Sequence, residues 1–392
     1  MTIEAAGETG VHRRIRLGMV GGGQGAFIGA VHRIAFRIDD QFELVAGALS
    51  SDPACAKASA KELGIPADRA YGGFEEMARA EAARADGIEA VSIVTPNHMH
   101  APVAKAFLEA GIHVICDKPL TTTVLEAEEL AALVEKSGKV FVVTHNYAGY
   151  PMIRQARAMV ASGDLGEIRL VQAEYLQDWL TERLEATGQK QAAWRTDPAR
   201  SGAGGCIGDI GTHAYHLACF VSGLELDELL AQLSTFVPGR QLDDDVQILL
   251  RWKGGAKGML WASQVAVGNE NGLKLRVHGT KGGLEWAQSD PNYLWFTPYG
   301  QPKQLLTRGG AGALPQAGRV TRVPSGHPEG YLEGFATIYA EAARTIRAAT
   351  AGVKPDPAVI YPTVYDGLAG MRFIDAAVKS SAANGTWVRV GR

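Results

Sequence analysis

The sequence has few of the features that mark disulfide-bonded, zinc-binding or membrane-spanning proteins. Its four cysteines are spread over 392 residues and form no CxxC pair, so neither a disulfide framework nor a zinc site is expected. No apolar run approaches the ~20 residues that a helix needs to cross a bilayer. Residues 1–14 are polar and lack the apolar segment of a signal peptide. We therefore expect a flexible tail there and a cytoplasmic protein without a membrane partner.

Strong charge of either sign is also missing. The chain carries 39 basic and 42 acidic residues, a formal net charge of -3, and no long run of one sign. This balance argues against a surface that binds nucleic acid. What the chain does have is 46% hydrophobic residues and enough length for two ordinary domains.

Residues 15–148 alternate short apolar runs with longer amphipathic segments. The runs are typical of buried strands, because their apolar residues are continuous. Strands that alternate with helices form a parallel sheet covered on both faces, so we predict an α/β domain of the doubly wound Rossmann type. The expected strands are residues 15–20, 42–49, 90–94, 113–116 and 140–143.

Residues 149–392 differ in character and predict an α+β domain for substrate binding and oligomerisation. Turns such as Lys281-Gly282-Gly283 separate strand-like runs, which favours hairpins and a large, mostly antiparallel sheet. Residues 300–326, rich in glycine, proline and glutamine, are expected to form a long loop. The expected strands are 167–175, 231–237, 246–252, 256–262, 273–278 and 386–390, and the expected late helices are 330–349 and 364–382.

Three glycines, Gly21, Gly22 and Gly23, directly follow the first expected strand. Glycine there permits positive φ angles and close approach of a dinucleotide pyrophosphate, which the next helix N-terminus stabilises. A tight turn without a ligand is the alternative. The third glycine of a G-x-G-x-x-G motif is replaced by Ala26, and Gly29 is the better candidate, which implies a longer loop. We assign cofactor binding to Gly21, Gly23, Gln24 and Gly25.

The end of the second expected strand normally carries the residue that contacts the adenosine ribose. Here Ser50 and Ser51 occupy that place, and we assign them to the cofactor. Asp52, followed by proline, is better explained as the start of the next helix. No arginine stands beside the serines to bind a 2′-phosphate, which favours NAD over NADP.

Three segments carry a more specific signal: residues 91–100 (VSIVTPNHMH), 109–120 (EAGIHVICDKPL) and 204–213 (GGCIGDIGTH). In order and spacing they resemble the Gfo/Idh/MocA family, the glucose–fructose oxidoreductase and inositol dehydrogenase group, over nearly the whole chain. The resemblance implies that Lys118 and the pair Asp209 and His213 are catalytic, with Asp117 where the family usually has glutamate. It also implies that the nicotinamide side is lined by Thr95, Pro96, Asn97 and His100, and we add Asp117, Lys118 and Asn146 to the cofactor contacts.

The chemistry of these side chains agrees with the implied roles. Oxidation of a secondary alcohol needs a base for the hydroxyl proton, and histidine titrates closest to neutral pH. Lys118 would stabilise the developing alkoxide, and Asp209, four residues before His213, would orient that histidine on one helix face. Asp209 as a helix cap and His213 as a core residue are the alternatives. His216 either shares the site or only packs.

Substrate contacts are expected from Tyr147, Trp194 and Arg195, besides Lys118, Asp209 and His213. A tryptophan next to arginine suits stacking on and hydrogen bonding to a sugar ring; a packing aromatic and a structural ion pair are the alternative. No metal is expected at the site, because hydride transfer to nicotinamide needs none.

These assignments predict an NAD(P)-dependent dehydrogenase that acts on a secondary alcohol of a sugar, sugar derivative or cyclitol. An NAD-retaining, redox-neutral glycosidase would use the same residues and is the alternative. A cofactor-bound sugar sensor is a third hypothesis, but a binder has no need of the catalytic set. Family relatives imply a homodimer or homotetramer.

Overall fold

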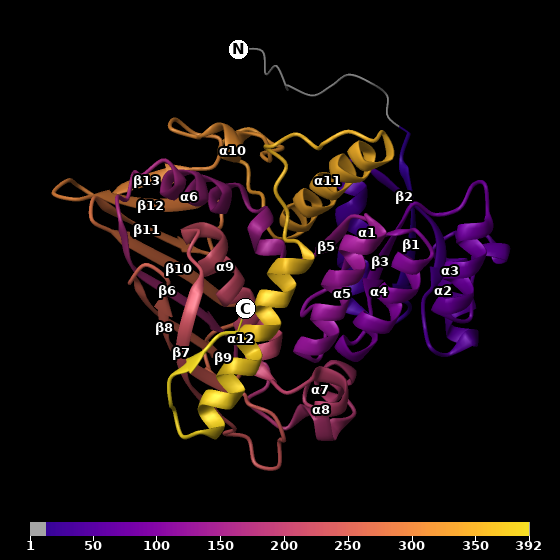
Figure 1. Ribbon diagram of the computed structural model, residues 1–392, viewed down its shortest axis with the longest axis horizontal. Coiled ribbons are helices and arrows are strands. Elements are labelled where there is room, and N and C mark those ends of the chain that lie inside the picture. The colour runs from indigo at the N-terminus through magenta and orange to yellow at the C-terminus, as the bar shows by residue number, and fades with distance from the viewer. Residues whose placement is uncertain (1–12, 392) are drawn as a thin grey trace.

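The computed structural model describes residues 13–391, so residues 1–12 of the expected tail lie outside the described residues. Two sheets dominate the molecule, one in each half of the chain, and the long helices α11 and α12 run between them (Figure 1). These helices are Tyr331–Thr350 and Val364–Ala382.

The first sheet is parallel and has the strand order β2-β1-β3-β4-β5. Its strands carry almost continuous apolar side chains because helices cover both faces. The predicted Rossmann-type domain is thus confirmed. The strands are β1 (Ile15–Gly21), β2 (Phe42–Ala48), β3 (Ala90–Val94), β4 (His113–Cys116) and β5 (Phe141–Val143), and the helices are α1 (Phe27–Ile38), α2 (Pro53–Glu62), α3 (Phe74–Ala83), α4 (His100–Glu109) and α5 (Val124–Ser137).

The second sheet has nine strands in the order β13-β12-β11-β10-β6-β9-β8-β7-β14. All its pairs are antiparallel except β6 with β9, so the predicted mostly antiparallel sheet is confirmed. The strands are β6 (Ile168–Leu176), β7 (Leu226–Ser234), β8 (Asp245–Trp252), β9 (Lys257–Ser263), β10 (Gly272–Gly279), β11 (Gly282–Ala287), β12 (Tyr293–Pro298), β13 (Gln304–Thr307) and β14 (Val388–Arg389).

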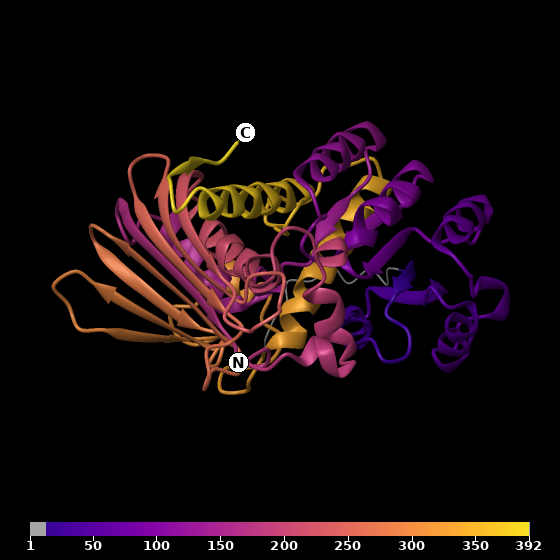
Figure 2. The same ribbon diagram turned by 90° about the horizontal axis from the view of Figure 1, so that it is seen from below.

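Helices pack on one face of this second sheet, as Figure 2 shows with α12 in yellow. The remaining helices of this half are α6 (Pro151–Ala161), α7 (Lys190–Arg195), α8 (Pro198–Ser201), α9 (Thr212–Ser222) and α10 (Pro315–Gly318). Two expectations need correction. Residues 300–326 are not all loop, since β13 and α10 lie within them, and the last strand has two residues rather than five.

Helix α11 belongs to the second half by sequence but packs on the first sheet. Its side chains Phe335, Ile338 and Tyr339 share a buried cluster with Leu17 of β1 and Phe36 of α1. Residues 331–350 complete one face of the parallel sheet. The two halves of the chain, divided at residue 148, therefore do not pack as two independent units.

Candidate active site

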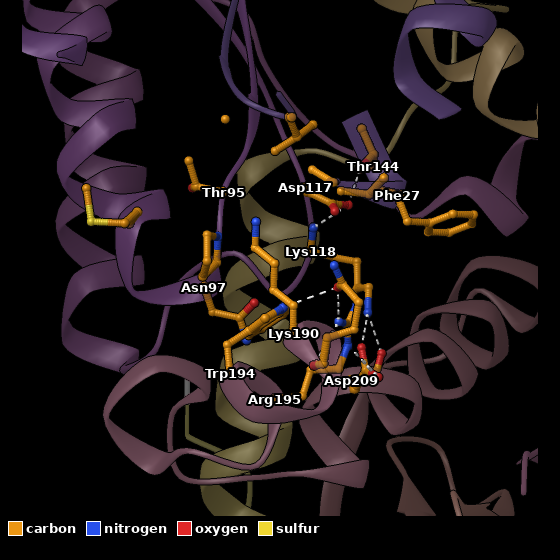
Figure 3. Close-up of a pocket in the computed structure, with 18 of the residues that line it drawn as sticks. Phe27, Thr95, Asn97, Asp117, Lys118, Thr144, Lys190, Trp194, Arg195 and Asp209 are labelled. Atoms are coloured by element: carbon orange, nitrogen blue, oxygen red, sulfur yellow. Dashed lines mark hydrogen bonds and ion pairs between the residues drawn. The ribbon is translucent and has the colours of Figure 1, made fainter. Parts of the chain in front are cut away.

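A cavity of about 970 Å³ lies between the two halves of the chain, at the carboxyl ends of the parallel strands. This is where open α/β sheets bind ligands. The glycine loop after β1 and the ends of β2 and β3 contribute to the lining, as do residues of β6, α7 and α9. Figure 3 shows Thr95, Asp117 and Lys118 from the first half of the chain with Trp194, Arg195 and Asp209 from the second half. The structure brings nearly all the predicted site residues to this one cavity: Gly21, Gly23, Gln24, Ser50, Ser51, Thr95, Pro96, Asn97, Asp117, Lys118, Asn146, Tyr147, Trp194, Arg195, Asp209 and His213.

The glycine loop has the geometry of a phosphate-binding turn. Gly21 and Gly22 have φ angles of 80° and 73°, which residues other than glycine rarely adopt. A Cβ on Gly23 would lie 2.6 Å from the carbonyl oxygen of Leu49. A Cβ on Gly29 would lie 2.4 Å from the Cα of Gly22, so Gly29 lets α1 pack directly on the loop. Gly29 thus has the place of the third glycine, as predicted.

The adenosine end of the cavity is lined by Ser50 and Ser51 at the end of β2. Asp52 caps α2, since its carboxylate accepts the backbone N–H of Cys55 at 2.7 Å, which confirms that it starts the helix. Glu75, in the first turn of α3, lines the same end and was missed by the sequence analysis.

The nicotinamide end contains polar atoms that lack partners within the described chain. Thr95 Oγ1 and Asn146 Nδ2 are buried without a hydrogen bond, and both residues line the cavity. Buried polar groups are normally paired, so a hydroxyl and an amide without partners fit a ligand that supplies donors and acceptors, as a carboxamide does. Together with the glycine loop, these residues fit a dinucleotide.

Two predicted contacts do not line the cavity. His100 is buried behind it, and its two ring nitrogens contact the carbonyl oxygens of Pro119 and Thr95, at 2.8 Å and 3.0 Å. Its ring therefore supports the segment after β3 and the Lys118 loop from behind. Gly25 is also absent from the lining, and its φ of 74° lets the loop bend.

Asp117 holds the backbone at Lys118. Its Oδ1 accepts the N–H of Lys118 at 2.9 Å and the hydroxyl of Thr144 at 2.8 Å. Asp117, shorter than the glutamate that the family usually has here, therefore binds its own loop through Lys118 and the end of β5 through Thr144.

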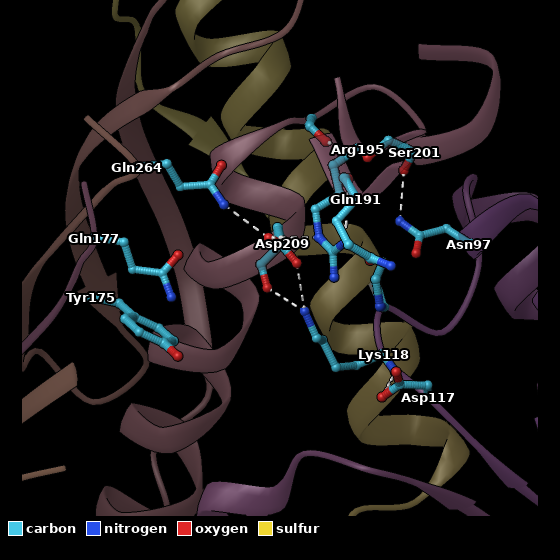
Figure 4. A network of polar contacts seen from close by, with 12 residues as sticks. Asn97, Asp117, Lys118, Tyr175, Gln177, Gln191, Arg195, Ser201, Asp209 and Gln264 are labelled. Carbon is cyan, nitrogen blue, oxygen red and sulfur yellow. Dashed lines mark hydrogen bonds and ion pairs between the residues drawn. The ribbon is translucent and has the colours of Figure 1, made fainter. Parts of the chain in front are cut away.

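Lys118, Arg195 and Gln264 converge on the carboxylate of Asp209 (Figure 4). Lys118 Nζ lies 3.0 Å from Oδ1, whereas Arg195 Nε and Gln264 Nε2 lie 3.2 Å and 2.9 Å from Oδ2. Burial alone would raise the pKa of Asp209, but the charges of Lys118 and Arg195 lower it well below its usual range. Asp209 is therefore ionised, and it fixes the position of the lysine ammonium.

His213 lies in the first turn of α9 and is not oriented by Asp209, contrary to the prediction. Asp209 lies in a π-helical turn, Ile207–Gly211, and its two oxygens are engaged by the three donors above. The His213 ring packs instead against Tyr147, with ring centroids 5.0 Å apart, and its Nδ1 is buried without a partner. Burial and the charge of Lys118 lower the pKa of His213 well below its usual range.

The π-helical turn is held by a carboxylate that lies far along the chain. Asp243 accepts the N–H groups of Gly205 and Ile207 at 2.6 Å and 2.8 Å, at the start of the segment that carries Asp209. A Cβ on Gly205 would lie 2.3 Å from the carbonyl oxygen of Asp243, so glycine is required there. Nothing in the local sequence points to this contact, because the β7–β8 connection brings Asp243 to it.

Comparison with known proteins gives the same assignment for both halves. Residues 15–145 match the family model described as an oxidoreductase family with an NAD-binding Rossmann fold, and residues 153–285 match the Gfo/Idh/MocA C-terminal domain. The chain belongs to the Gfo/Idh/MocA family. It therefore contains an NAD-binding oxidoreductase domain, as the motifs in residues 91–120 and 204–213 implied.

Relatives within the Gfo/Idh/MocA family include sugar and cyclitol enzymes. An oxidoreductase from Sinorhizobium meliloti is 60% identical, with a TM-score of 0.87 over 96% of this chain and 100% of that chain. An inositol dehydrogenase homolog from Azotobacter vinelandii, solved with NADH and myo-inositol, is 38% identical, with a TM-score of 0.90 over 96% of this chain and 98% of that chain. Levoglucosan dehydrogenase of Pseudarthrobacter phenanthrenivorans is 32% identical over 69% of this chain and 73% of its own length.

On the substrate side of this Gfo/Idh/MocA protein, Arg195 is engaged by the protein itself. Its guanidinium contacts Asp209, its Nη1 donates to Gln191 Oε1 at 2.6 Å, and the group lies 4.2 Å from the Trp194 ring centroid. The ion pair of the alternative is therefore present, but Trp194 and Arg195 also line the cavity, so their contact with substrate stays a prediction. The sequence analysis missed several lining residues, which come from separate elements and have no local motif: Tyr175, Gln177, Lys190, Asn271 and Gln288.

Two further observations concern the described residues as a whole. Within residues 13–391, no group of three or more His, Cys, Asp or Glu side chains is arranged to hold a metal ion. No described helix combines the length and the apolar character needed to cross a membrane.

Proposed function

We propose that this protein is an NAD-dependent dehydrogenase that oxidises a secondary hydroxyl of a neutral sugar, sugar derivative or cyclitol. The observation that carries the proposal is the convergence of Lys118, Asp209 and His213 at the nicotinamide end of the cavity. The Azotobacter and Pseudarthrobacter relatives, whose names refer to a cyclitol and a sugar derivative, support the same substrate class.

The side chains divide the reaction between them. His213 Nδ1 is buried, which leaves Nε2 to accept the hydroxyl proton of the substrate. The Lys118 ammonium, fixed by Asp209, stabilises the negative charge that develops on the substrate oxygen. Bound nicotinamide supplies the acceptor for the hydrogen on the carbinol carbon, together with its two electrons.

The hydrogen-bonding groups of the substrate side favour a neutral polyol. The single carboxylate of Asp209 lies between Lys118 and Arg195, so it offsets one of their two charges and leaves one positive charge beside the substrate oxygen. The neighbouring lining consists largely of amide and phenol groups, which exchange hydrogen bonds with hydroxyls: Tyr147, Tyr175, Gln177, Asn271 and Gln288.

The adenosine end favours NAD over NADP. Ser50 and Ser51 can hydrogen-bond a free ribose hydroxyl, and the carboxylate of Glu75 lines the same region. A carboxylate there would repel the 2′-phosphate of NADP.

An absorbance assay tests the proposal directly. Purified protein is mixed with NAD or NADP and with myo-inositol, levoglucosan, free sugars, their phosphate esters and glycosides. We expect reduced cofactor to form with NAD and a neutral polyol, and not with the phosphate ester of that polyol. Release of an aglycone from a glycoside without net reduction of NAD would contradict a dehydrogenase and support the redox-neutral glycosidase.

We also infer a homodimer or homotetramer. The face of the nine-stranded sheet opposite the helices exposes a group of apolar side chains: Leu170, Leu249, Met259, Trp261 and Trp295. Exposed apolar patches of this kind mark protein interfaces. Light scattering after size exclusion is expected to give a mass two or four times that of one chain. The substitution Trp261→Lys is expected to shift the measured mass towards that of the monomer. A monomeric parent protein would refute the inference.

A further inference from the structure

Two histidines without an assigned role lie next to His213. His145 follows β5, and His216 lies one turn after His213 on α9. The His145 and His213 rings are nearly perpendicular, with centroids 5.6 Å apart and an interplanar angle of 86°. Its face stacks on His216, with centroids 4.2 Å apart and an interplanar angle of 6°. All three rings are buried, so they form a continuous column of imidazoles that begins at the proposed base.

The column is not explained by packing alone. His145 Nδ1, His213 Nδ1 and His216 Nε2 are each buried without a hydrogen-bond partner in the described chain. An unpaired buried nitrogen costs free energy, and an apolar ring such as phenylalanine would stack without that cost. Such nitrogens are places where an ordered water binds, and imidazole can take up a proton at one nitrogen and release it from the other.

The far end of the column reaches a carboxylate at the protein surface. His216 Nε2 lies 4.0 Å from Asp366 Oδ1, in the first turn of α12. The Asp366 side chain is 42% exposed, and it does not line the active-site cavity. The column therefore connects the buried base to solvent by a route separate from the mouth of the cavity.

Burial, with the nearby positive charges, disfavours the protonated form of all three rings and lowers their pKa values. Burial lowers the pKa of His216 to about 4, with Asp366 opposing and Arg157 and Arg154 of α6 adding to the effect. At the inner end, Lys118 lowers the pKa of His213, and Asp209 opposes it. A cationic imidazolium is thus disfavoured at each position, so a proton would not be trapped there.

We propose that His145 and His216 form a proton relay that carries the proton of the substrate hydroxyl from His213 to Asp366 and the solvent. This inference rests on the proposed function. For each alcohol oxidised, one proton reaches His213 Nε2, and one proton leaves from Nδ1, passes through the rings of His145 and His216, and departs from His216 Nε2 towards Asp366. Since no hydrogen bond joins these rings in the structure, each transfer requires a bridging water or a small ring rotation. No electrons move along this route, since the hydrogen with its electron pair goes to the cofactor.

The test measures proton release and cofactor reduction separately. Enzyme loaded with NAD is mixed in a stopped-flow instrument with the polyol it oxidises in the panel, beginning with myo-inositol. NADH is followed by absorbance and the released proton by a pH-indicator dye. In the parent protein, we expect the proton signal to rise together with NADH. In His216→Phe, which keeps a stacking ring but no nitrogen, we expect proton release to be slower by roughly tenfold.

Two further variants separate a relay from a packing role. Phe220, whose ring lies 5.8 Å from that of His216, provides the control: Phe220→Leu disturbs the packing and is expected to leave the two signals together. In Asp366→Asn, the side-chain oxygen can still accept the N–H of Thr363, the N-cap residue of α12, so the capping contact is kept. We expect this variant to delay proton release as His216→Phe does. Proton release that keeps pace with NADH in both His216→Phe and Asp366→Asn would overturn the relay. Absence of NADH with every polyol would instead refute the proposed function, and the relay with it.

Discussion

Lys118→Met is expected to lower kcat/KM for polyol oxidation by about a thousandfold, because it removes the ammonium group that stabilises the developing alkoxide. Methionine preserves much of the length and apolar character of the side chain, so the loop between β4 and α5 should keep its shape. The substitution also leaves Asp209 with Arg195 and Gln264 but without its contact to Oδ1. Steady-state kinetics with NAD and the polyol found in the panel measure the effect.

The matched control for this variant is Lys190→Met, which removes another lysine from the same cavity. Since no contact joins Lys190 to Asp209, we expect the Lys190→Met variant to lose less than about tenfold in kcat/KM. Binding of NAD, measured by calorimetry, should be similar in both variants if Lys118 acts mainly on the substrate oxygen. A Lys118→Met enzyme with the kcat/KM of the parent would show that another group stabilises the alkoxide.

His213→Gln is expected to lower kcat by about a thousandfold and to change the pH dependence of the reaction. Burial and the charge of Lys118 hold the pKa of His213 well below its usual range, so the base is unprotonated at neutral pH. In the parent protein, kcat/KM should be level at neutral pH and fall in acid, as His213 gains a proton and can no longer accept one. Glutamine does not titrate, so the residual activity of the variant should lack this acid limb.

His98→Gln controls for the loss of an imidazole from the cavity. His98 lines the cavity, but it is not part of the column that begins at His213. We expect this variant to keep the acid limb of kcat/KM. An acid limb that persists in His213→Gln would mean that a different group accepts the substrate proton.

The sequence predicts the residues that occur in local motifs, and it fails for contacts made between distant segments. Lys118, Asp209 and His213 are recognisable because each lies in a short segment of defined spacing. Gly29 is recognisable because close packing of α1 on the glycine loop tolerates no Cβ. Asp243 and Gln264 have no such signal, since only the pairing of β8 with β9 and the folding of the second domain bring them to the turn that carries Asp209.

His100 shows the opposite kind of failure. Its place in the motif after β3 suggested contact with the nicotinamide, but its side chain turns inward, and its two ring nitrogens lie within hydrogen-bonding distance of two backbone carbonyls. A motif specifies which residue type stands at a position, whereas the direction of the side chain depends on polar backbone groups that must be satisfied nearby. The role predicted for Asp209 failed for a related reason, because its oxygens are occupied by donors from three different segments.

The position of α11 has a consequence for how the protein acquires its structure during synthesis. When residue 148 has left the ribosome, all five strands of the parallel sheet have been made, yet one face of that sheet lacks the helix that buries Leu17 and Phe36. That helix is translated about 180 residues later, so the nucleotide-binding half has to wait, with apolar surface exposed, for nearly the entire remaining chain. Its maturation is therefore tied to synthesis of most of the second sheet, since only β14 follows α11. A translation product that stops before residue 331 would contain the glycine loop and the motifs around Thr95 and Lys118 but not a finished domain to hold a dinucleotide.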